Sequence, residues 1–216
     1  MKSDGFVPAL GYSFLTPMYD LVVGVTTREA EFKRALVAQA KIEAGHRVLD
    51  LACGTGTLAI LIKRTVPNSE ITGIDGDSAM LETAKAKSKK AGTDIRFDNG
   101  MSFDLPYEDD SFDRVVSSLF FHHLTRDDKR RTLREVKRVL TPGGEFHVAD
   151  WGRPANLIMR MASKAIQLLD GFETTADNFR GRLPQIIGEE GFGSVEETSS
   201  YDTLFGTIRL HKSRKI

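Results

Sequence analysis

The chain is poor in cysteine, because Cys53 is the only one among its 216 residues. A single cysteine excludes an internal disulfide framework and any metal site that needs several thiolates. The chain also lacks the run of roughly 18 apolar residues that a membrane-spanning helix requires. Residues 1–10 include Lys2 and Asp4 but no apolar run long enough for a signal peptide, so we expect a cytoplasmic protein.

The chain also has no excess of charge of either sign. Thirty Lys and Arg residues balance thirty Asp and Glu residues, so the formal net charge is zero. Proteins that nucleic acid holds by bulk charge usually present a basic face, so we expect no nucleic-acid partner and no stable membrane insertion. Hydrophobic residues make up 40% of the chain and charged residues 28%, and these values, with the length, are typical of one globular domain.

Helical and strand-like segments alternate over the first 150 residues. The expected elements are a helix at 28–42, a strand at 47–51, a helix at 58–64, a strand at 70–74, a helix at 78–91, strands at 94–97 and 114–117, a helix at 129–140 and a strand at 145–149. Ser78 is expected to cap the helix at 78–91, and Gly92 to end it. This alternation predicts a parallel sheet with helices on both faces.

The pattern changes after Trp151. Two amphipathic segments predict helices at 156–169 and 178–190, and two strand-like runs at 194–203 and 205–212 predict an antiparallel hairpin. The expected fold is therefore α/β, a Rossmann-like doubly wound sheet of seven mostly parallel strands that ends in an antiparallel hairpin strand. No linker divides the chain, so we expect a single domain over residues 1–216.

A glycine-rich turn is the most informative segment. Residues 48–58 run from a buried strand into this turn and then into a helix, and Gly54 and Gly56 allow the backbone to approach a ligand closely. In open α/β sheets such a turn faces a crevice at the carboxyl ends of the strands. The glycine spacing alone also fits a dinucleotide fingerprint, which leaves an NAD-binding oxidoreductase open.

Two carboxylates make the ligand more specific. Asp50 precedes the glycines and suits a cationic amino group rather than a pyrophosphate, which needs bare N–H groups. Asp75 ends the next strand and suits the hydroxyls of a ribose. Together they indicate a nucleoside that carries an amino-acid tail. The alternatives are that Asp50 caps a helix and Asp75 forms an Asx turn, and Cys53 more simply packs as a small apolar side chain.

Four ordered motifs within residues 48–150 resemble those of class I S-adenosylmethionine-dependent methyltransferases. Residues 48–58 resemble motif I, 71–81 the segment after it, 105–113 the "LPF-x-D-x-SFD" segment and 133–144 motif III. The small-molecule branch that includes the ubiquinone/menaquinone C-methyltransferases is the most similar, and residues 14–20 also resemble it. The resemblance implies S-adenosyl-L-methionine as cofactor, S-adenosyl-L-homocysteine as product and a small-molecule methyl acceptor. It divides the domain into an N-terminal helical lid (1–45), a cofactor-binding core (46–150), a substrate-covering insertion (151–178) and a closing helix and hairpin (179–216).

The resemblance also assigns roles to residues. In the family, Asp50 and the glycine backbone hold the methionine part, Asp75 holds the ribose hydroxyls, and Met80 lies against the adenine. The family usually has Gly-Asp-Ala where this chain has residues 100–102, Gly-Met-Ser, so adenine binding is expected to depend on backbone groups and apolar packing. The predicted cofactor-binding residues are Tyr19, Asp50, Ala52, Gly54, Gly56, Asp75, Gly76, Met80, Gly100, Met101, Ser102, Ser118 and Leu119.

The fourth strand is followed by Ser118, Leu119, two phenylalanines and the pair His122 and His123. His122 is the candidate base or substrate contact because histidine titrates near neutral pH, whereas a structural role is expected for His123. Apolar residues crowd 157–169, where they form either a lid on the substrate, the face of a packed helix or a dimer contact. Trp151 either stacks on a planar substrate or fills the sheet edge.

The predicted function is methyl transfer from S-adenosyl-L-methionine to a small apolar or aromatic molecule, without a metal. The alternatives are a module that binds this cofactor without turnover and, less favoured, an NAD-binding oxidoreductase. A macromolecular acceptor is disfavoured because no Asn-Pro-Pro-Tyr-type motif follows the fourth strand. The sequence leaves open whether the protein is a monomer or a homodimer.

Overall fold

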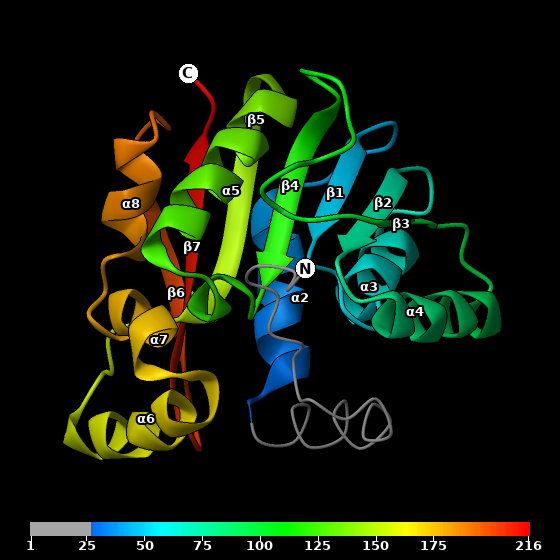
Figure 1. Cartoon of the computed structure of the whole chain (residues 1–216). Helices are drawn as coiled ribbons and strands as arrows, with labels where there is room; N and C mark the ends of the chain where they lie inside the picture. The colour runs from blue at the N-terminus through cyan, green and yellow to red at the C-terminus, as the bar shows by residue number, and fades with distance from the viewer. Residues whose placement is uncertain (1–26) are drawn as a thin grey trace, which may run out of the picture.

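The computed structural model describes residues 27–216 and contains one seven-stranded sheet (Figure 1). Its strands are β1 (Arg47–Leu51), β2 (Glu70–Asp75), β3 (Arg96–Asn99), β4 (Phe112–Ser118), β5 (Leu140–Trp151), β6 (Glu196–Thr203) and β7 (Gly206–Arg214). Their order across the sheet is β3-β2-β1-β4-β5-β7-β6. The first five are parallel, whereas β7 runs antiparallel to both β5 and β6. The predicted fold class is therefore confirmed, including the closing hairpin.

Helices cover both faces of the sheet. They are α2 (Glu29–Ala40), α3 (Thr57–Thr65), α4 (Ser78–Ala91), α5 (Arg126–Val139), α6 (Leu157–Asp170), α7 (Phe172–Phe179) and α8 (Leu183–Glu189), with a 3-10 turn η2 (Phe121–His123). One buried apolar cluster joins α2 and α3 to the sheet through Val48 and Val116. The other joins α5 and α8 to it through Leu49 and Val115. Strand alternation explains the division, because neighbouring residues of β1 and β4 face opposite sides.

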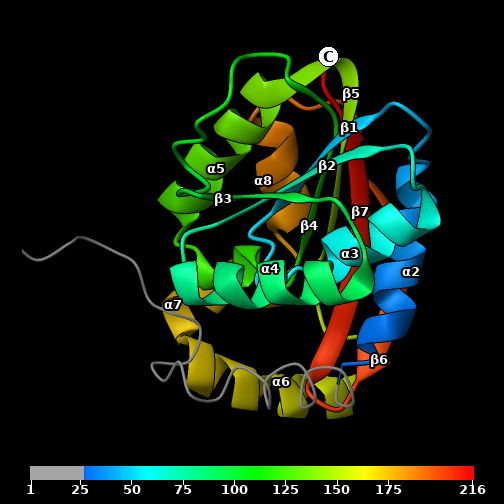
Figure 2. The same ribbon diagram turned by 90° about the vertical axis from the view of Figure 1, so that its right-hand side faces the viewer.

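The chain order reverses between β1 and β4, which lie side by side at the centre of the sheet. The strands on one side continue outward as β2 and β3, and those on the other as β5 and β7. In open α/β sheets, ligands bind at this reversal, outside the carboxyl ends of the strands. Figures 1 and 2 show α6 and α7 at that same end of the molecule, and the C-terminus at the opposite end.

Two local predictions are wrong. Asp77, not Ser78, caps α4, because its side chain accepts hydrogen bonds from the backbone N–H groups of Ala79 and Met80. The helix expected at 178–190 is the end of α7 followed by α8, and Gly181 separates them with a φ of +72°. That conformation favours glycine and cannot continue a helix.

No helix within residues 27–216 is long and apolar enough to cross a membrane.

Candidate functional site

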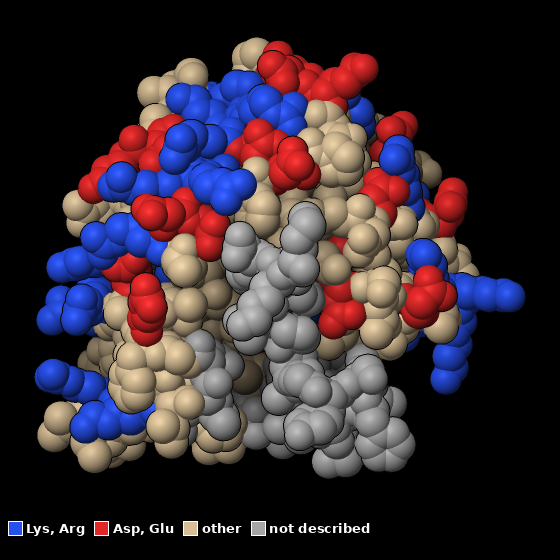
Figure 3. Space-filling view, in the orientation of Figure 1, with Lys and Arg blue, Asp and Glu red and all other residues tan. Residues whose placement is uncertain are grey.

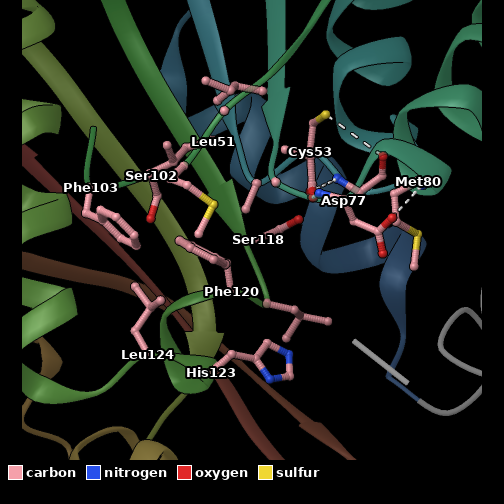
Figure 4. Close-up of a pocket in the computed structure, with 18 of the residues that line it drawn as sticks. Leu51, Cys53, Asp77, Met80, Ser102, Phe103, Ser118, Phe120, His123 and Leu124 are labelled. Carbon is pink, nitrogen blue, oxygen red and sulfur yellow. Dashed lines mark hydrogen bonds between the residues drawn. The ribbon is translucent and has the colours of Figure 1, made fainter. Parts of the chain in front are cut away.

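A cavity of about 440 Å³ lies at the carboxyl ends of β1, β2 and β4. Its lining residues are Glu29, Lys33, Leu51, Ala52, Cys53, Gly54, Thr55, Ile74, Asp75, Gly76, Asp77, Met80, Gly100, Met101, Ser102, Phe103, Ser118, Leu119, Phe120, His123, Leu124, Thr125, Asp128 and Thr174. Figure 4 shows two sides of this space, with Cys53, Asp77 and Met80 on one and Phe103, Phe120, Leu124 and His123 on the other. Small-molecule sites commonly have this size and this mixture of apolar walls and a few polar groups.

Asp75 and Gly54 form the polar corner of the cavity. The Gly54 N–H donates to Asp75 Oδ2 at 2.8 Å, and the Asp77 N–H donates to Oδ1 at 2.9 Å. Burial raises the pKa of Asp75, and the N–H groups of Asp77 and Gly54 partly oppose that rise. A carboxylate oxygen can accept more than one hydrogen bond, so Asp75 keeps acceptor capacity toward the cavity. A Cβ on Gly54 would have no atom within 4 Å, which shows how open its position is.

Gly56 does not line the cavity. Its φ of +75° starts α3, and a Cβ there would lie 3.0 Å from the Ala84 Cβ and 3.1 Å from Phe97 Cζ. Contacts as short as these would push α3 away from α4 and β3. The structure therefore gives the second glycine of the turn a packing role and leaves Gly54 next to the ligand space.

Asp50 is 1% exposed and is absent from the cavity lining. Its Oδ2 has no hydrogen-bond partner within residues 27–216. Burial raises its pKa to about 7; Lys33 and the Ala59 N–H, in the first turn of α3, oppose this rise, and Asp75 adds to it. The Ala59 contact supports the capping alternative for Asp50. The unpartnered oxygen fits an additional, cationic partner, because a buried carboxylate without one is costly.

Two non-glycine residues at the strand ends adopt a left-handed backbone. Ala52 follows β1 with a φ of +56°, and Leu119 follows β4 with a φ of +53°. Both line the cavity, and the Leu119 N–H is held by the Ala149 carbonyl at 2.8 Å. Such conformations cost roughly 1–2 kcal/mol per residue and tend to occur at functional sites. These two turns direct the chain around the cavity instead of continuing the strands.

The segment that follows β3 forms an apolar wall. Met101 lines the cavity and pairs with Asp104 in an isolated bridge, and Met80 of α4 lines the cavity as well. The Ser102 hydroxyl is 2.8 Å from that of Thr132 of α5. The expectation that an adenine here would rely on backbone groups and packing stays a prediction.

The two histidines lie differently from the prediction. His122 is buried, does not line the cavity and has its Nδ1 2.7 Å from Asp150 Oδ1. His123 lines the cavity and packs against His122 with ring centroids 3.9 Å apart. Burial and the neighbouring His122 lower the pKa of His123 to about 3, so its ring is neutral at physiological pH. The positions of the pair thus favour His123 as the group that meets a substrate.

Asp150 holds the loop that carries these histidines. Its Oδ2 accepts the Phe120 N–H at 3.1 Å, and its Oδ1 accepts the Trp151 N–H at 2.7 Å. Burial raises the pKa of Asp150, but its interaction with His122 and the hydrogen bond from Trp151 outweigh burial, so the net shift is downward. Asp150 is therefore a fully partnered buried carboxylate that fixes the Phe120–His123 segment.

The far wall of the cavity comes from η2, α5 and α7. Arg131 of α5 lies 4.3 Å from the ring centre of Phe103, and Thr174 of α7 lines the cavity beside Leu124. Lys129, which is buried, donates from Nζ to the Leu124 carbonyl at 2.8 Å and the Thr174 carbonyl at 2.7 Å. This lysine joins the turn after β4 to α7 and so holds the wall together.

Other predicted features have definite positions. Trp151 does not lie at the sheet edge, because it ends the interior strand β5 and pairs with Ile208 of β7. It is buried, packs against Phe179 with centroids 6.3 Å apart and does not line the cavity, so the substrate-stacking alternative is not supported either. Cys53 is buried, and burial raises the pKa of its thiol, in keeping with a packing role. Tyr19 lies outside the described residues. Of the predicted cofactor residues, Ala52, Gly54, Asp75, Gly76, Met80, Gly100, Met101, Ser102, Ser118 and Leu119 do line the cavity.

Sequence reasoning missed the residues that other elements bring to the cavity. Glu29 and Lys33 come from α2, Asp128 from α5 and Thr174 from α7. None belongs to a motif, so only the tertiary fold identifies them. Phe103, Phe120 and Leu124 also line the cavity, but a signal for them exists in the sequence. They are apolar residues that follow β3 and β4, and such residues are expected near a cavity at the strand ends.

The comparisons with known proteins agree with this geometry. Residues 48–144 match a family model described as a methyltransferase domain. The chain is 32% identical over 209 residues to a ubiquinone/menaquinone biosynthesis C-methyltransferase of Xanthomonas campestris, a match that covers 86% of this chain and 79% of the relative. The chain belongs to the class I S-adenosylmethionine-dependent methyltransferase family. S-adenosyl-L-methionine is the cofactor that this membership implies.

Other methyltransferases match over different shares of their length. A demethylmenaquinone methyltransferase of Deinococcus radiodurans is 37% identical over 147 residues, or 67% of this chain and 60% of the relative. The match thus spans less than two thirds of that relative. The solved structure of a SAM-dependent methyltransferase from Aquifex aeolicus, 15% identical, superposes with a TM-score of 0.70 over 95% of this chain and 99% of its own, and this supports the fold.

The cavity suits the cofactor of the methyltransferase family on structural grounds. Asp75 can accept hydroxyls, and Met80 and Met101 offer an apolar surface. Asp50 is not itself a lining residue, but its unpartnered oxygen can receive a cation. Residues 27–216 hold no group of three or more His, Cys, Asp or Glu side chains placed to bind a metal ion.

Proposed function

We propose that this chain transfers a methyl group from S-adenosyl-L-methionine to a ring carbon of a small quinol. The single observation that supports this most directly is the two-sided cavity, which has carboxylates at one side and phenyl, leucine and imidazole side chains at the other. The relatives named above, a demethylmenaquinone methyltransferase and a ubiquinone/menaquinone C-methyltransferase, support the acceptor class. The cytoplasmic location remains a prediction from the sequence.

In this proposal the carboxylates position the cofactor. Asp75 accepts the ribose hydroxyls, and Asp50 receives the ammonium of the methionine part at its unpartnered oxygen. The open Gly54 lets backbone approach the same ligand, whereas Gly56 acts only through packing. Met80 and Met101 flank the adenine. Bound S-adenosyl-L-methionine supplies an electrophilic methyl group on its sulfonium.

The opposite wall positions the acceptor. Phe103, Phe120 and Leu124 provide apolar and aromatic surface for a planar ring, and a neutral His123 forms a hydrogen bond with the ring hydroxyl. A new carbon–carbon bond forms as the methyl–sulfur bond breaks, and the ring carbon then loses its proton to water. Alignment of the reacting atoms is the main contribution that the protein makes to such a displacement, worth up to about 7–11 kcal/mol. With a pKa near 3, His123 orients the hydroxyl better than it removes a proton.

The test is methyl transfer from S-adenosyl-L-methionine labelled in its methyl group to a short-chain naphthoquinol kept reduced. We expect a product methylated on ring carbon, distinguished from an O-methyl ether by NMR and mass spectrometry. His123→Gln is expected to lower kcat about tenfold or more, with little effect on the dissociation constant of S-adenosyl-L-homocysteine. His122→Gln is the matched comparison at the adjacent position, which does not line the cavity.

Two outcomes would overturn the proposal. Calorimetric binding of S-adenosyl-L-homocysteine without methylation of any quinol or phenol would indicate a module that binds the cofactor without turnover. Binding of NAD in place of S-adenosyl-L-homocysteine would indicate an oxidoreductase.

A further inference from the structure

All but one of the large apolar side chains that the described residues expose belong to α6, α7 and the β6–β7 turn. They are Leu157, Ile158, Met161 and Leu168 of α6, Phe172 at the start of α7 and Leu204 in the β6–β7 turn, and the exception is Ile216. The first six, here called the apolar face, are 59–75% exposed. The β6–β7 hairpin and α7 both pack against α6, so these side chains share one region of the surface. Exposed apolar clusters of this kind mark interaction sites more often than chance.

The spacing along α6 explains the exposure. Leu157, Met161, Lys164 and Leu168 follow one another at intervals of four, three and four residues, which places them on one side of the helix. Ser163, on the opposite side, is buried toward the sheet. The helix therefore uses its inner side to hold the fold, and its outer apolar side has no role within residues 27–216. This outcome matches neither the lid nor the packed-core prediction for these outer residues.

The charges in residues 153–169, which include most of α6, have one sign. Residues 153–169 contain Arg153, Arg160 and Lys164 and no Asp or Glu. All three cations are exposed, and Figure 3 shows basic and uncharged surface together in the lower left, where α6 lies. Exposed carboxylates stand only beside the other members of the apolar face: Glu173 follows Phe172, and Asp202 lies two residues before Leu204.

The apolar face and the cavity both involve α7. Phe172 belongs to it, while Thr174, two residues further along α7, lines the cavity. The figures place α6 and α7 at the end of the molecule toward which the carboxyl ends of the central strands point. Whatever binds the apolar face therefore lies at the same end of the molecule as the cavity.

We propose that the apolar face docks the protein reversibly on an anionic lipid bilayer. An interfacial helix inserts apolar side chains at the level of the headgroups while neighbouring Lys and Arg side chains pair with anionic lipids, and α6 has both features. A second copy of the chain fits less well. A two-fold interface with α6 against α6 would bring Arg160 and Lys164 of both copies together, and residues 153–169 hold no carboxylate to neutralise them. Docking is peripheral, and it does not rest on the methyltransferase assignment because it needs neither cofactor nor acceptor.

The experiment is flotation of the full chain with vesicles of phosphatidylcholine alone or mixed with phosphatidylglycerol, without cofactor. We expect strong binding to the anionic vesicles and weak binding to the neutral ones. The variant Ile158→Ser, Met161→Ser, Leu168→Ser is expected to bind about 100-fold less. Arg160→Gln with Lys164→Gln is expected to bind anionic vesicles about 30-fold less, because each cation contributes roughly a fivefold step.

Matched controls separate the apolar face from general stickiness and charge. Ile216→Ser removes an equally exposed apolar side chain near the opposite end, and Lys89→Gln with Lys90→Gln removes two exposed cations from α4. Both controls should bind as the unchanged protein does, and circular dichroism should show every variant folded.

Absence of binding to anionic vesicles would overturn the proposal, and so would equal losses in the control variants. Analytical ultracentrifugation gives the remaining outcome. A dimer that the triple serine variant dissociates, without vesicle binding by the unchanged protein, would assign the apolar face to a second copy instead. Each of these results is independent of whether methyl transfer is observed.

Discussion

Asp50 and Asp150 stand at comparable places and have opposite surroundings. Each is 1% exposed and lies toward the carboxyl end of a parallel strand, Asp50 in β1 and Asp150 in β5. Asp150 accepts hydrogen bonds from Phe120 and Trp151 and pairs with His122, and its pKa is lowered. Asp50 keeps one oxygen without a partner within residues 27–216, and its pKa is raised to about 7.

The difference indicates what each carboxylate does. A buried charge whose partners are all in the chain is costly to disrupt, because the partners lose their acceptor, whereas one that lacks a partner destabilises the fold until a ligand supplies one. Asp150 therefore fixes the Phe120–His123 segment, and Asp50 is suited to bind a cationic group of the cofactor. This contrast can be tested in both directions.

The largest effect is expected from Asp150→Ala. Removal of this carboxylate leaves His122 and the N–H groups of Phe120 and Trp151 without their acceptor, and should lower the free energy of unfolding by about 3–5 kcal/mol. Urea unfolding followed by circular dichroism measures it. Asp150→Asn keeps an acceptor oxygen and should lose less. An Asp150→Ala protein as stable as the original would break the comparison.

Asp50→Asn should leave the free energy of unfolding unchanged or raise it slightly, unlike Asp150→Ala. The amide removes a buried charge, so at pH 8 the free energy of unfolding without cofactor should stay the same or rise by about 1 kcal/mol. The dissociation constant of S-adenosyl-L-homocysteine should increase at least tenfold, about 1.4 kcal/mol.

Asp75→Ala, which removes the proposed ribose contact, should weaken the binding of S-adenosyl-L-homocysteine by at least the same factor as Asp50→Asn. Unchanged affinity in both folded variants, measured by calorimetry, would refute the assigned cofactor site.

The raised pKa of Asp50 predicts a pH dependence. The pKa of Asp50 is about 7 in the folded protein and ordinarily about 3.9 in the unfolded chain. The protonated carboxyl therefore contributes its full stabilisation of the fold below about pH 3.9, and this contribution is lost as the pH rises through about 7. A cationic ligand favours the ionised form, so affinity for S-adenosyl-L-homocysteine should rise about tenfold from pH 6 to pH 8. Calorimetry in buffers of different ionisation enthalpy should show proton release on binding. A similar rise in Asp50→Asn would assign the effect to another group.

The smallest effect concerns the turn that follows Asp50. Ala52 has a φ of +56°, which glycine adopts without strain. Ala52→Gly should therefore raise the free energy of unfolding, but by less than about 1 kcal/mol. The gain is small because glycine also loses more conformational freedom on folding than alanine does. Thermal unfolding measures the change. A clearly destabilised variant would show that the methyl group of Ala52 matters more than its backbone.

The sequence predicted most where local rules decide the structure. The bounds of β1 and α4 were predicted correctly, because a short apolar run and a helix with a glycine stop each have strong local signals. The segment 178–190 was not, because Gly181 breaks an otherwise continuous amphipathic pattern. In the site, Gly54 and Asp75 belong to motifs, whereas Lys33 and Thr174 reach the cavity only through the tertiary fold.

The histidine pair shows a second limit. Alternation along a strand predicts which residues share a face, but β4 ends at Ser118 and the left-handed Leu119 and the 3-10 turn η2 follow. Because of those turns, His123 lines the cavity, whereas the side chain of His122 contacts Asp150. Two adjacent histidines cannot be distinguished without the geometry of that turn.

The antiparallel course of β7 has a practical consequence. It carries the chain from the end of the molecule near α6 back to the opposite end, where Lys215 pairs with Asp110 and donates to the Leu140 carbonyl (Figure 1). A fluorophore or a surface-immobilisation tag attached after Ile216 would therefore stand away from both the cavity and the apolar face. Immobilised protein could then be presented with vesicles or cofactor without the attachment point blocking either.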